Sequence, residues 1–232
     1  MDIKDSDWEF SDRERMFDLL AGDFKPDLSF EKRFSEYSVF KFKVASTIIR
    51  ELGLNKSMTG IEIGAGCGLL SNAISQQVKT LNCVDISQSF LDFAKDNCPT
   101  QKNINFIKVN SAQFDFADDN SQDFILSSSV FIHLNLYDIF WHFQEARRVL
   151  KREGVFSFEI LEADRTSLSE DTKFLQMAGF FKTNPKSVET LFAYHSKVII
   201  DDMELNLGFS SFVPEKANKH ATKTRLFYKK VC

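Results

Sequence analysis

The sequence predicts an α/β protein: a three-layer αβα sandwich around a seven-stranded, mostly parallel sheet whose last strand is antiparallel. Short apolar runs alternate with amphipathic helical stripes along most of the chain, a pattern typical of parallel strands joined by crossover helices. The last two apolar runs are joined by a polar loop, so the final strand should return as a hairpin partner. The length of 232 residues fits a single domain spanning residues 1–232.

The first predicted elements precede the sheet. Residues 13–20 carry an apolar helical stripe, and the Pro26-Asp27 pair ends it with a turn. A second helix is expected from Val39 to Leu52, because its apolar residues share one face and Gly53 follows at its C-terminus. Residues 1–37 therefore form a segment outside the predicted core.

A glycine-rich turn follows the first predicted strand, residues 60–63. Residues 62–68 read E-x-G-x-G-x-G, and a helix begins at Leu69. Glycine permits positive φ and leaves room for a ligand against the main chain, while the helix directs free N–H groups at that ligand. A dinucleotide-binding loop, G-x-G-x-x-G, would need glycine in place of Leu69.

The second predicted strand, residues 81–86, carries a carboxylate near its end. Asp85 lies 17 positions beyond Gly68, about the length of one helix and one strand. A carboxylate there can accept hydrogen bonds from both hydroxyls of a ribose. Ser87 is the better N-cap for the helix expected over residues 88–97, which leaves Asp85 available for a ligand.

Three further strands complete the parallel part of the predicted sheet. The third, residues 104–109, ends at Asn110; the fourth begins at Asp123 and runs into residues 127–134. A one-face apolar stripe predicts a helix over residues 136–150 before the fifth strand. The remaining expected elements are strand 155–160, an insertion over 161–197, a helix at 202–207 and strands 209–213 and 224–231.

In this order the patterns resemble the class I S-adenosylmethionine (SAM) dependent methyltransferases. The resemblance rests on the E-x-G-x-G-x-G turn, Asp85, the fourth strand with its closing V-F-I-H-L run, and the R-V-L-K-R-E-G turn before strand five. It covers residues 40–160 strongly and 198–231 weakly. It implies a Rossmann-like sheet, SAM as the methyl donor and S-adenosylhomocysteine (SAH) as the product. The family usually carries aspartate where this chain has Asn110, whose amide oxygen can still accept a bond from the adenine amino group.

The resemblance also implies a set of cofactor contacts. These residues lie at or beyond the carboxyl ends of predicted strands, where open α/β sheets bind their ligands. The predicted cofactor-binding residues are Glu62, Gly64, Ala65, Gly66, Gly68, Asp85, Ile86, Asn110, Ser111, Ala112, Ser127 and Ser128. The domain then divides into an N-terminal lid (1–37), a SAM-binding core (38–160), a substrate cover (161–197) and a C-terminal helix with a strand hairpin (198–232).

Methyl transfer needs a general base only if the acceptor loses a proton, so the catalytic predictions concern few residues. His133 follows strand four at the mouth of the site and is the best base candidate, with a packing role as the alternative. Tyr37 could reach over the cofactor or be an interfacial core residue. Tyr194 and His195 lie in the insertion and are further candidates. No histidine pairs with carboxylates at ligand spacing, so no metal is predicted.

The acceptor is expected to be a small organic molecule methylated on oxygen or nitrogen. Residues 1–37 and 161–197 are rich in aromatic side chains, which suits an acceptor with an apolar part and equally suits a dimer contact. The net charge of −4 comes without a block of basic residues, which argues against DNA as the acceptor. The chain also lacks, after strand four, the [DNS]-P-P-[YFW] run of enzymes that methylate amino groups of DNA. No apolar run approaches membrane length and no leader is visible, so a cytoplasmic monomer or homodimer is predicted.

Three other functions remain open at this point. A protein or RNA methyltransferase would be expected to show a basic or extended acidic groove. A SAM-binding protein without transferase activity would share the same cofactor residues. A nicotinamide oxidoreductase is disfavoured by Leu69 and by the missing hydride-transfer residues.

Overall fold

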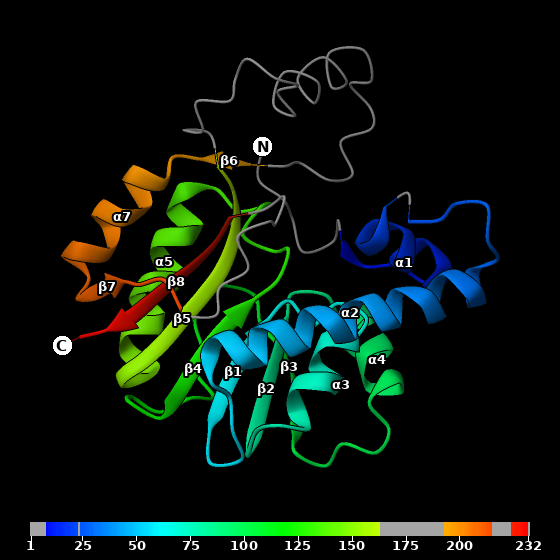
Figure 1. Cartoon of the computed structure of the whole chain (residues 1–232), viewed down its shortest axis with the longest axis horizontal. Helices are drawn as coiled ribbons and strands as arrows, with labels where there is room; N and C mark the ends of the chain where they lie inside the picture. The colour runs from blue at the N-terminus through cyan, green and yellow to red at the C-terminus, as the bar shows by residue number, and fades with distance from the viewer. Residues whose placement is uncertain (1–7, 23, 163–192, 215–223, 232) are drawn as a thin grey trace.

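One mixed sheet runs through the middle of the computed structural model, which describes residues 8–22, 24–162, 193–214 and 224–231 (Figure 1). The strands are β1 Thr59–Ile63, β2 Thr80–Asp85, β3 Ile104–Lys108, β4 Gln122–Ser127, β5 Leu150–Glu162, β6 Tyr194–His195, β7 Phe209–Ser211 and β8 Thr224–Lys230. Their order is β3-β2-β1-β4-β5-β8-β7. The first five strands in this order are parallel, and β8 is antiparallel to both β5 and β7.

This topology confirms the predicted fold class, including the antiparallel last strand. One element was not predicted: the two-residue strand β6 pairs with the end of β5 outside the main path. Its pairing joins Leu161 to Tyr194 and Glu162 to His195. Residues near the end of the predicted substrate cover therefore pair with the carboxyl end of β5.

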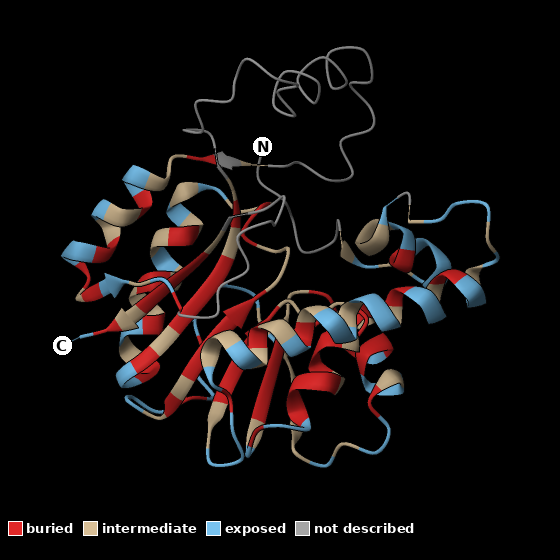
Figure 2. Cartoon of the chain, in the orientation of Figure 1, coloured by how far each residue is buried: buried red, intermediate tan, exposed pale blue. Residues whose placement is uncertain are grey.

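Helices cover both faces of the sheet. They are α1 Arg13–Ala21, α2 Phe30–Leu52, α3 Leu69–Ser75, α4 Gln88–Asn97, α5 Leu136–Val149 and α7 Lys197–Asn206. Successive residues of one strand enter opposite cores: Cys83 belongs to the cluster that includes residues of α2, α3 and α4, whereas Val84 belongs to the cluster that includes residues of α5 and α7. Figure 2 shows the strands largely buried between these two helical layers.

Aromatic rings fill much of the core beneath α5. Phe143 on α5 lies edge-on to Phe156, Phe158 and Tyr228, with ring centroids 5.1–5.7 Å apart. Phe131, from the loop after β4, stacks on Phe158 at 4.3 Å. All five side chains are fully buried, so core filling accounts for part of the high phenylalanine content.

Helix α2 begins at Phe30, nine residues before the predicted start at Val39. Its first turns pack against α1 and, through Phe34 stacked on Phe93, against α4. Phe30, Phe34 and Tyr37 lie at helical spacing, so a signal for the earlier start was present in the sequence. Arg33 pairs with Asp18 at 2.7 Å, and the Tyr37 hydroxyl donates to the Leu20 carbonyl at 3.0 Å. The predicted boundary between lid and core, after residue 37, therefore falls inside a continuous helix.

Three other predicted boundaries are shifted. Helix α5 ends at Val149, and β5 begins directly at Leu150 with a register shift against β4 instead of starting after the turn at residue 154. Helix α7 starts at Lys197 rather than at residue 202. Strand β7 ends at Ser211, two residues before the predicted end. Bulges and short edge strands lack the regular periodicity from which boundaries are predicted.

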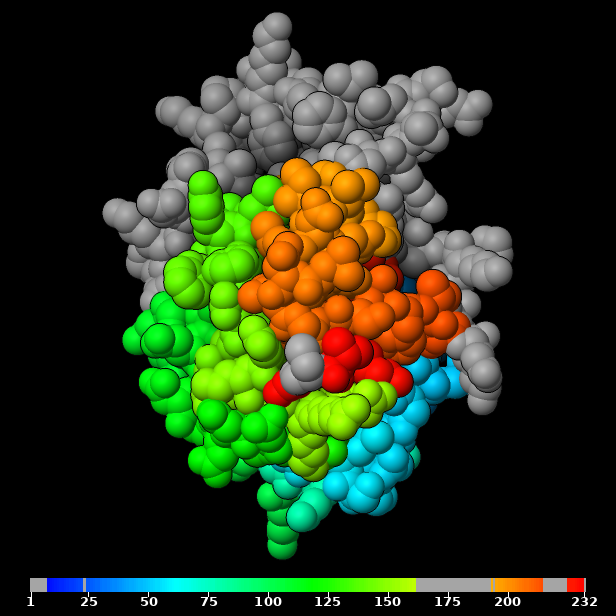
Figure 3. Space-filling view, turned by 90° about the vertical axis from the view of Figure 1, so that its left-hand side faces the viewer, coloured from blue at the N-terminus to red at the C-terminus, as the bar shows by residue number. Residues whose placement is uncertain are grey.

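Helix α7 and the β7–β8 hairpin close one end of the molecule (Figure 3). The buried Lys230 at the end of β8 donates to the Leu150 carbonyl at 2.7 Å and to the Asn120 side chain at 2.8 Å. These bonds fasten the last strand to the start of β5. None of the described helices is long and apolar enough to cross a membrane. Cys67, Cys83 and Cys98 are free and buried, and Cys232 lies outside the described residues.

Candidate cofactor and active site

At two positions of the turn after β1, neighbouring atoms leave no room for a Cβ, so glycine is required. Gly64 has φ 81°, and a Cβ there would lie 2.1 Å from Cγ2 of Val130, in the loop after β4. Gly68 has φ 77°, and a Cβ there would lie 2.7 Å from the Cα of Ala94 on α4. Gly64 thus lets two loops approach at the ends of β1 and β4, whereas Gly68 lets the N-terminus of α3 pack on α4.

Gly68→Ala is expected to lower the free energy of unfolding by about 2–4 kcal/mol, because it combines a left-handed φ with a clash against backbone atoms. Gly53→Ala is the matched control: φ is 61°, and the space around its Cβ is open, so only about 1 kcal/mol of backbone strain is expected. Urea unfolding of both variants measures the difference. Equal losses would show that the contact with Ala94 relaxes without cost.

Asp85 ends β2 with its carboxylate held by backbone donors. One oxygen accepts from the Gly66 N–H at 3.2 Å and the other from the Ser87 N–H at 3.0 Å. Burial raises the pKa of this carboxyl to about 6, although both backbone bonds act in the opposite direction. The predicted N-cap is confirmed, since the Ser87 hydroxyl accepts from the Phe90 N–H at 3.1 Å. Asp85 is therefore oriented by the glycine turn and remains exposed to the cavity.

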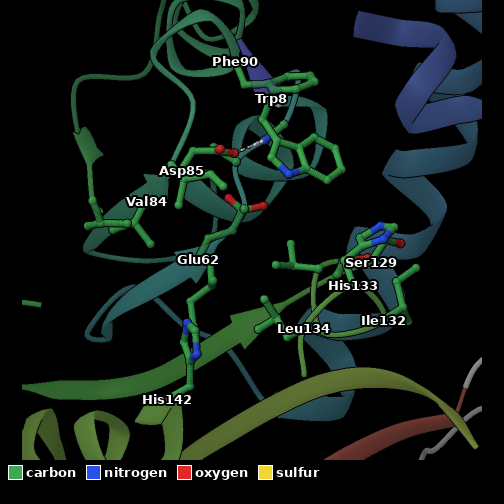
Figure 4. A pocket seen from close by; sticks show the side chains of 18 of the residues that line it. Trp8, Glu62, Val84, Asp85, Phe90, Ser129, Ile132, His133, Leu134 and His142 are labelled. Atoms are coloured by element: carbon green, nitrogen blue, oxygen red, sulfur yellow. Dashed lines mark hydrogen bonds between the residues drawn. The ribbon is translucent and has the colours of Figure 1, made fainter. Parts of the chain in front are cut away.

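Glu62 places a second carboxyl on the same cavity. Its side chain is 1% exposed and accepts from the Cys83 thiol at 3.3 Å. Burial raises the pKa of Glu62 to about 7, with Asp85 adding to the rise and Lys41 opposing it. Figure 4 shows Glu62 and Asp85 facing the same space. Two carboxyl groups with raised pKa values favour a ligand that brings positive charge.

The cavity spans the carboxyl ends of β1, β2, β3 and β4 and has a volume of about 1580 Å³. Of the predicted cofactor residues, those that line it are Glu62, Gly64, Ala65, Gly66, Asp85, Ile86, Asn110, Ser111, Ala112 and Ser128. Gly68 and Ser127 are not among the lining residues. Gly68 packs on α4, and the buried Ser127 hydroxyl donates to the Ile63 carbonyl at 3.0 Å. The cofactor roles of the whole set stay predictions.

The catalytic candidates are placed differently from one another. His133 lines the cavity, with its ring 5.6 Å from the Trp8 ring. Tyr37 also lines it, but its hydroxyl donates to Leu20 and burial raises the pKa of the phenol well above its usual value, so this group keeps its proton. His195 is buried, its pKa is lowered by burial, and it is not among the lining residues. The side chain of Tyr194 lies outside the described residues, as do residues 163–192 of the predicted substrate cover.

The lining residues that the sequence analysis did not assign to the site include Lys41, Trp141 and His142, whereas Trp8 belongs to the aromatic segment 1–37 that was predicted as the lid. Lys41 lies one helical turn after Tyr37, with its ammonium 5.6 Å from the centre of that ring, so their spacing was an available signal. His142 Nδ1 is 2.7 Å from the Asp138 carbonyl oxygen, and burial lowers the pKa of this histidine. Among the described residues no group of three histidine, cysteine or carboxylate side chains is arranged to hold a metal ion.

Comparisons with known proteins agree with this geometry. The methyltransferase domain family matches residues 61–158. Among solved structures, magnesium protoporphyrin IX methyltransferase from Synechocystis PCC 6803, solved with bound SAH, is 15% identical and aligns over 93% of each chain with a TM-score of 0.63. YcgJ from Bacillus subtilis is 19% identical, with coverage of 72% of this chain and 68% of YcgJ and a TM-score of 0.59.

A SAM-dependent methyltransferase from Methanosarcina mazei is 15% identical, with coverage of 77% of this chain and 94% of that protein and a TM-score of 0.59. A search of curated protein sequences gives no match. At these identities the solved structures establish the fold, and the domain match supports methyl transfer as the kind of chemistry. Residues 61–158 therefore match a methyltransferase domain within a Rossmann-like fold, consistent with the class I, S-adenosylmethionine-dependent family that the sequence motifs resemble.

Proposed function

We propose that this protein transfers the methyl group of SAM to an oxygen or nitrogen atom of a small organic acceptor. The observation that carries the proposal is the convergence of Glu62 and Asp85 beside the glycine turn, with raised pKa values in one cavity. SAM has a sulfonium and an ammonium group, and its positive charge would stabilise both carboxylates. The anionic pyrophosphate of a nicotinamide cofactor would be repelled by them.

Each part of the cofactor has a matching group in the cavity. The two Asp85 oxygens have acceptor capacity left beyond their backbone bonds, so the carboxylate can accept the ribose hydroxyls. Asn110 is assigned to the adenine amino group. Glu62 is assigned to the ammonium group and Lys41 to the carboxylate of the methionyl part, because these opposite charges line the same cavity.

The size and lining of the cavity support a small acceptor bound next to the cofactor. Its volume of about 1580 Å³ exceeds the roughly 300–1,000 Å³ typical of a pocket for one small molecule. Apolar side chains of Trp8, Leu20, Ile132 and Leu134 line it together with His133. An acceptor with an apolar body and one reactive oxygen or nitrogen fits this mixture.

When bound, SAM supplies an electrophilic methyl group, and the protein has to align the acceptor and exclude water. Alignment of this kind is worth roughly 7–11 kcal/mol of barrier. His133 is assigned as the base for an acceptor that loses a proton, since its ring faces the cavity beside Trp8. Trp8 covers that side of the site and limits water access.

Thermal unfolding with SAM, SAH and NAD tests the cofactor assignment. Ligand at 100 times its dissociation constant should stabilise the protein by about 2.7 kcal/mol, with SAM and SAH effective and NAD inactive. A larger shift with NAD than with SAM or SAH would refute it.

A second experiment identifies the class of acceptor. The protein is incubated with methyl-labelled SAM and cell extract, and the label is followed in small-molecule, protein and RNA fractions. Label in the small-molecule fraction is expected. Label confined to protein or RNA would assign one of the macromolecular alternatives, and SAM binding without transfer to any fraction would indicate a binding protein.

A further inference from the structure

The residues just before α1 are bound to the N-terminus of α4 through Glu9. Its carboxylate accepts from the backbone N–H groups of Gln88 at 2.9 Å and Ser89 at 3.0 Å, and from the Lys108 ammonium at 2.9 Å. Burial alone would raise the pKa of Glu9, but these donors lower it to about 2. The first free N–H groups of a helix favour an anion, so Glu9 is a strong intramolecular ligand for this helix end.

Neighbouring contacts extend the attachment along α4. The Phe10 N–H donates to the Ser89 hydroxyl at 3.1 Å, and the Phe10 ring lies edge-on to Phe90 with centroids 6.2 Å apart. Arg13 pairs with Asp96, and its guanidinium lies 5.1 Å from the Phe93 ring centre. The segment is therefore held by polar bonds and by a strip of aromatic surface.

Trp8 extends from this attachment across the cavity. It lines the cavity together with Asp85 and Phe90, and its ring lies 5.6 Å from that of His133, beyond the end of β4. Figure 4 shows the indole between Phe90 and His133. Residues 8–12 thus bridge the two sides of the cofactor site, from the N-terminus of α4 to the loop after β4.

We propose that residues 8–12 are a strap that retains the cofactor, with Trp8 as its cover and the bond between Glu9 and α4 as its latch. The inference rests on the proposed cofactor site, since Trp8 lies beside the carboxylate assigned to the ribose. Cofactor exchange then requires the latch to open. Opening releases only the few contacts of one short segment and leaves the sheet core intact, so it is a local event rather than unfolding.

The test is the dissociation rate of SAH from the full-length protein. Wild type and variants are loaded with radiolabelled SAH and chased with excess unlabelled SAH. Glu9→Gln keeps the size of the side chain but loses the charge-assisted bonds, so dissociation should accelerate roughly tenfold. Lys108→Met removes one partner of the latch and should accelerate it by a smaller factor. Trp8→Ala removes the cover and should accelerate it as well.

Glu14→Gln is the matched control, because Glu14 is an exposed carboxylate on the first turn of α1, five residues along the same segment. Its dissociation rate should equal that of wild type. Equal SAH dissociation from wild type, Glu9→Gln and Trp8→Ala would overturn the strap and leave the proposed function standing. Failure of wild type to bind SAH at all would overturn both.

Discussion

Asp85→Ala is expected to weaken SAH binding at least tenfold while the fold persists. The substitution removes the acceptor for the ribose hydroxyls, and charge-assisted hydrogen bonds are each worth about 1.5–3 kcal/mol. The fold should tolerate it, since the backbone bonds lost with Gly66 and Ser87 are offset by removal of a half-buried carboxyl whose pKa is raised to about 6. Calorimetric titration with SAH measures the change. Unchanged affinity would mean that the ribose lies elsewhere.

The pKa of Asp85 gives the same prediction a pH signature. The carboxylate form accepts the hydroxyl bonds, and the group is protonated below about pH 6, so SAH affinity should fall as the pH decreases through that value. Asp85→Asn cannot titrate and should lose this part of the pH dependence. Glu62, with a pKa of about 7, remains in both proteins, so some pH dependence persists in the variant, with the pKa of Glu62 lowered by the loss of the Asp85 charge. Identical pH profiles would contradict the assignment of Asp85.

Glu159→Ala is expected to destabilise the protein by about 3–5 kcal/mol, the typical loss when one partner of a buried ion pair is removed. Glu159 on β5 and Arg225 on β8 are 15% and 11% exposed and lie 2.5 Å apart. Glu159 also accepts from the backbone N–H of Ser129, a residue with φ 67°, at 3.1 Å. The variant therefore leaves a largely buried guanidinium with only the Ser127 carbonyl and the Ser157 hydroxyl as partners among the described residues, and it releases the strained turn after β4.

Two control variants show whether the loss of stability comes from the burial of the ion pair or from the loss of a charge alone. Asp92→Ala breaks the exposed pair with Lys95 and should change the free energy of unfolding by less than about 1 kcal/mol. The double variant Glu159→Met/Arg225→Met removes both buried charges and should recover much of the loss. Urea unfolding of the four proteins provides the comparison. If Glu159→Ala lowers the free energy of unfolding no more than Asp92→Ala does, the pair of Glu159 and Arg225 is screened by solvent like an exposed pair.

The parts of the fold that were predicted correctly have local signals. Asp85 could be placed at a strand end because an apolar run precedes it and the N-cap Ser87 follows it. These two signals limit the end of the strand to a few residues. The same holds for the glycine turn, where the strand, the turn and the helix are consecutive. These features depend on backbone preferences and periodic burial, both of which are visible in the sequence.

The parts that were missed depend on contacts between distant segments. Glu9 binds α4 across 79 residues of sequence, and Arg225 reaches Glu159 across 66. The early start of α2 depends on its contact with α1, through pairs such as Arg33 with Asp18. An apolar stripe marks the face that a helix buries, but neither the segment that covers that face nor the partner of a long-range bond can be inferred from the periodicity, so such features become visible only once the chain is folded.

The positions of the tryptophans provide an optical assay for a site whose acceptor is unidentified. The chain has two tryptophans, Trp8 and Trp141, and both line the cavity. Trp141 is 59% exposed, whereas Trp8 is half-buried against aromatic neighbours, so the two indoles emit from environments of different polarity. A compound that displaces water from either ring will shift its emission. Intrinsic fluorescence can therefore screen a chemical library for acceptors before any product of the reaction is known.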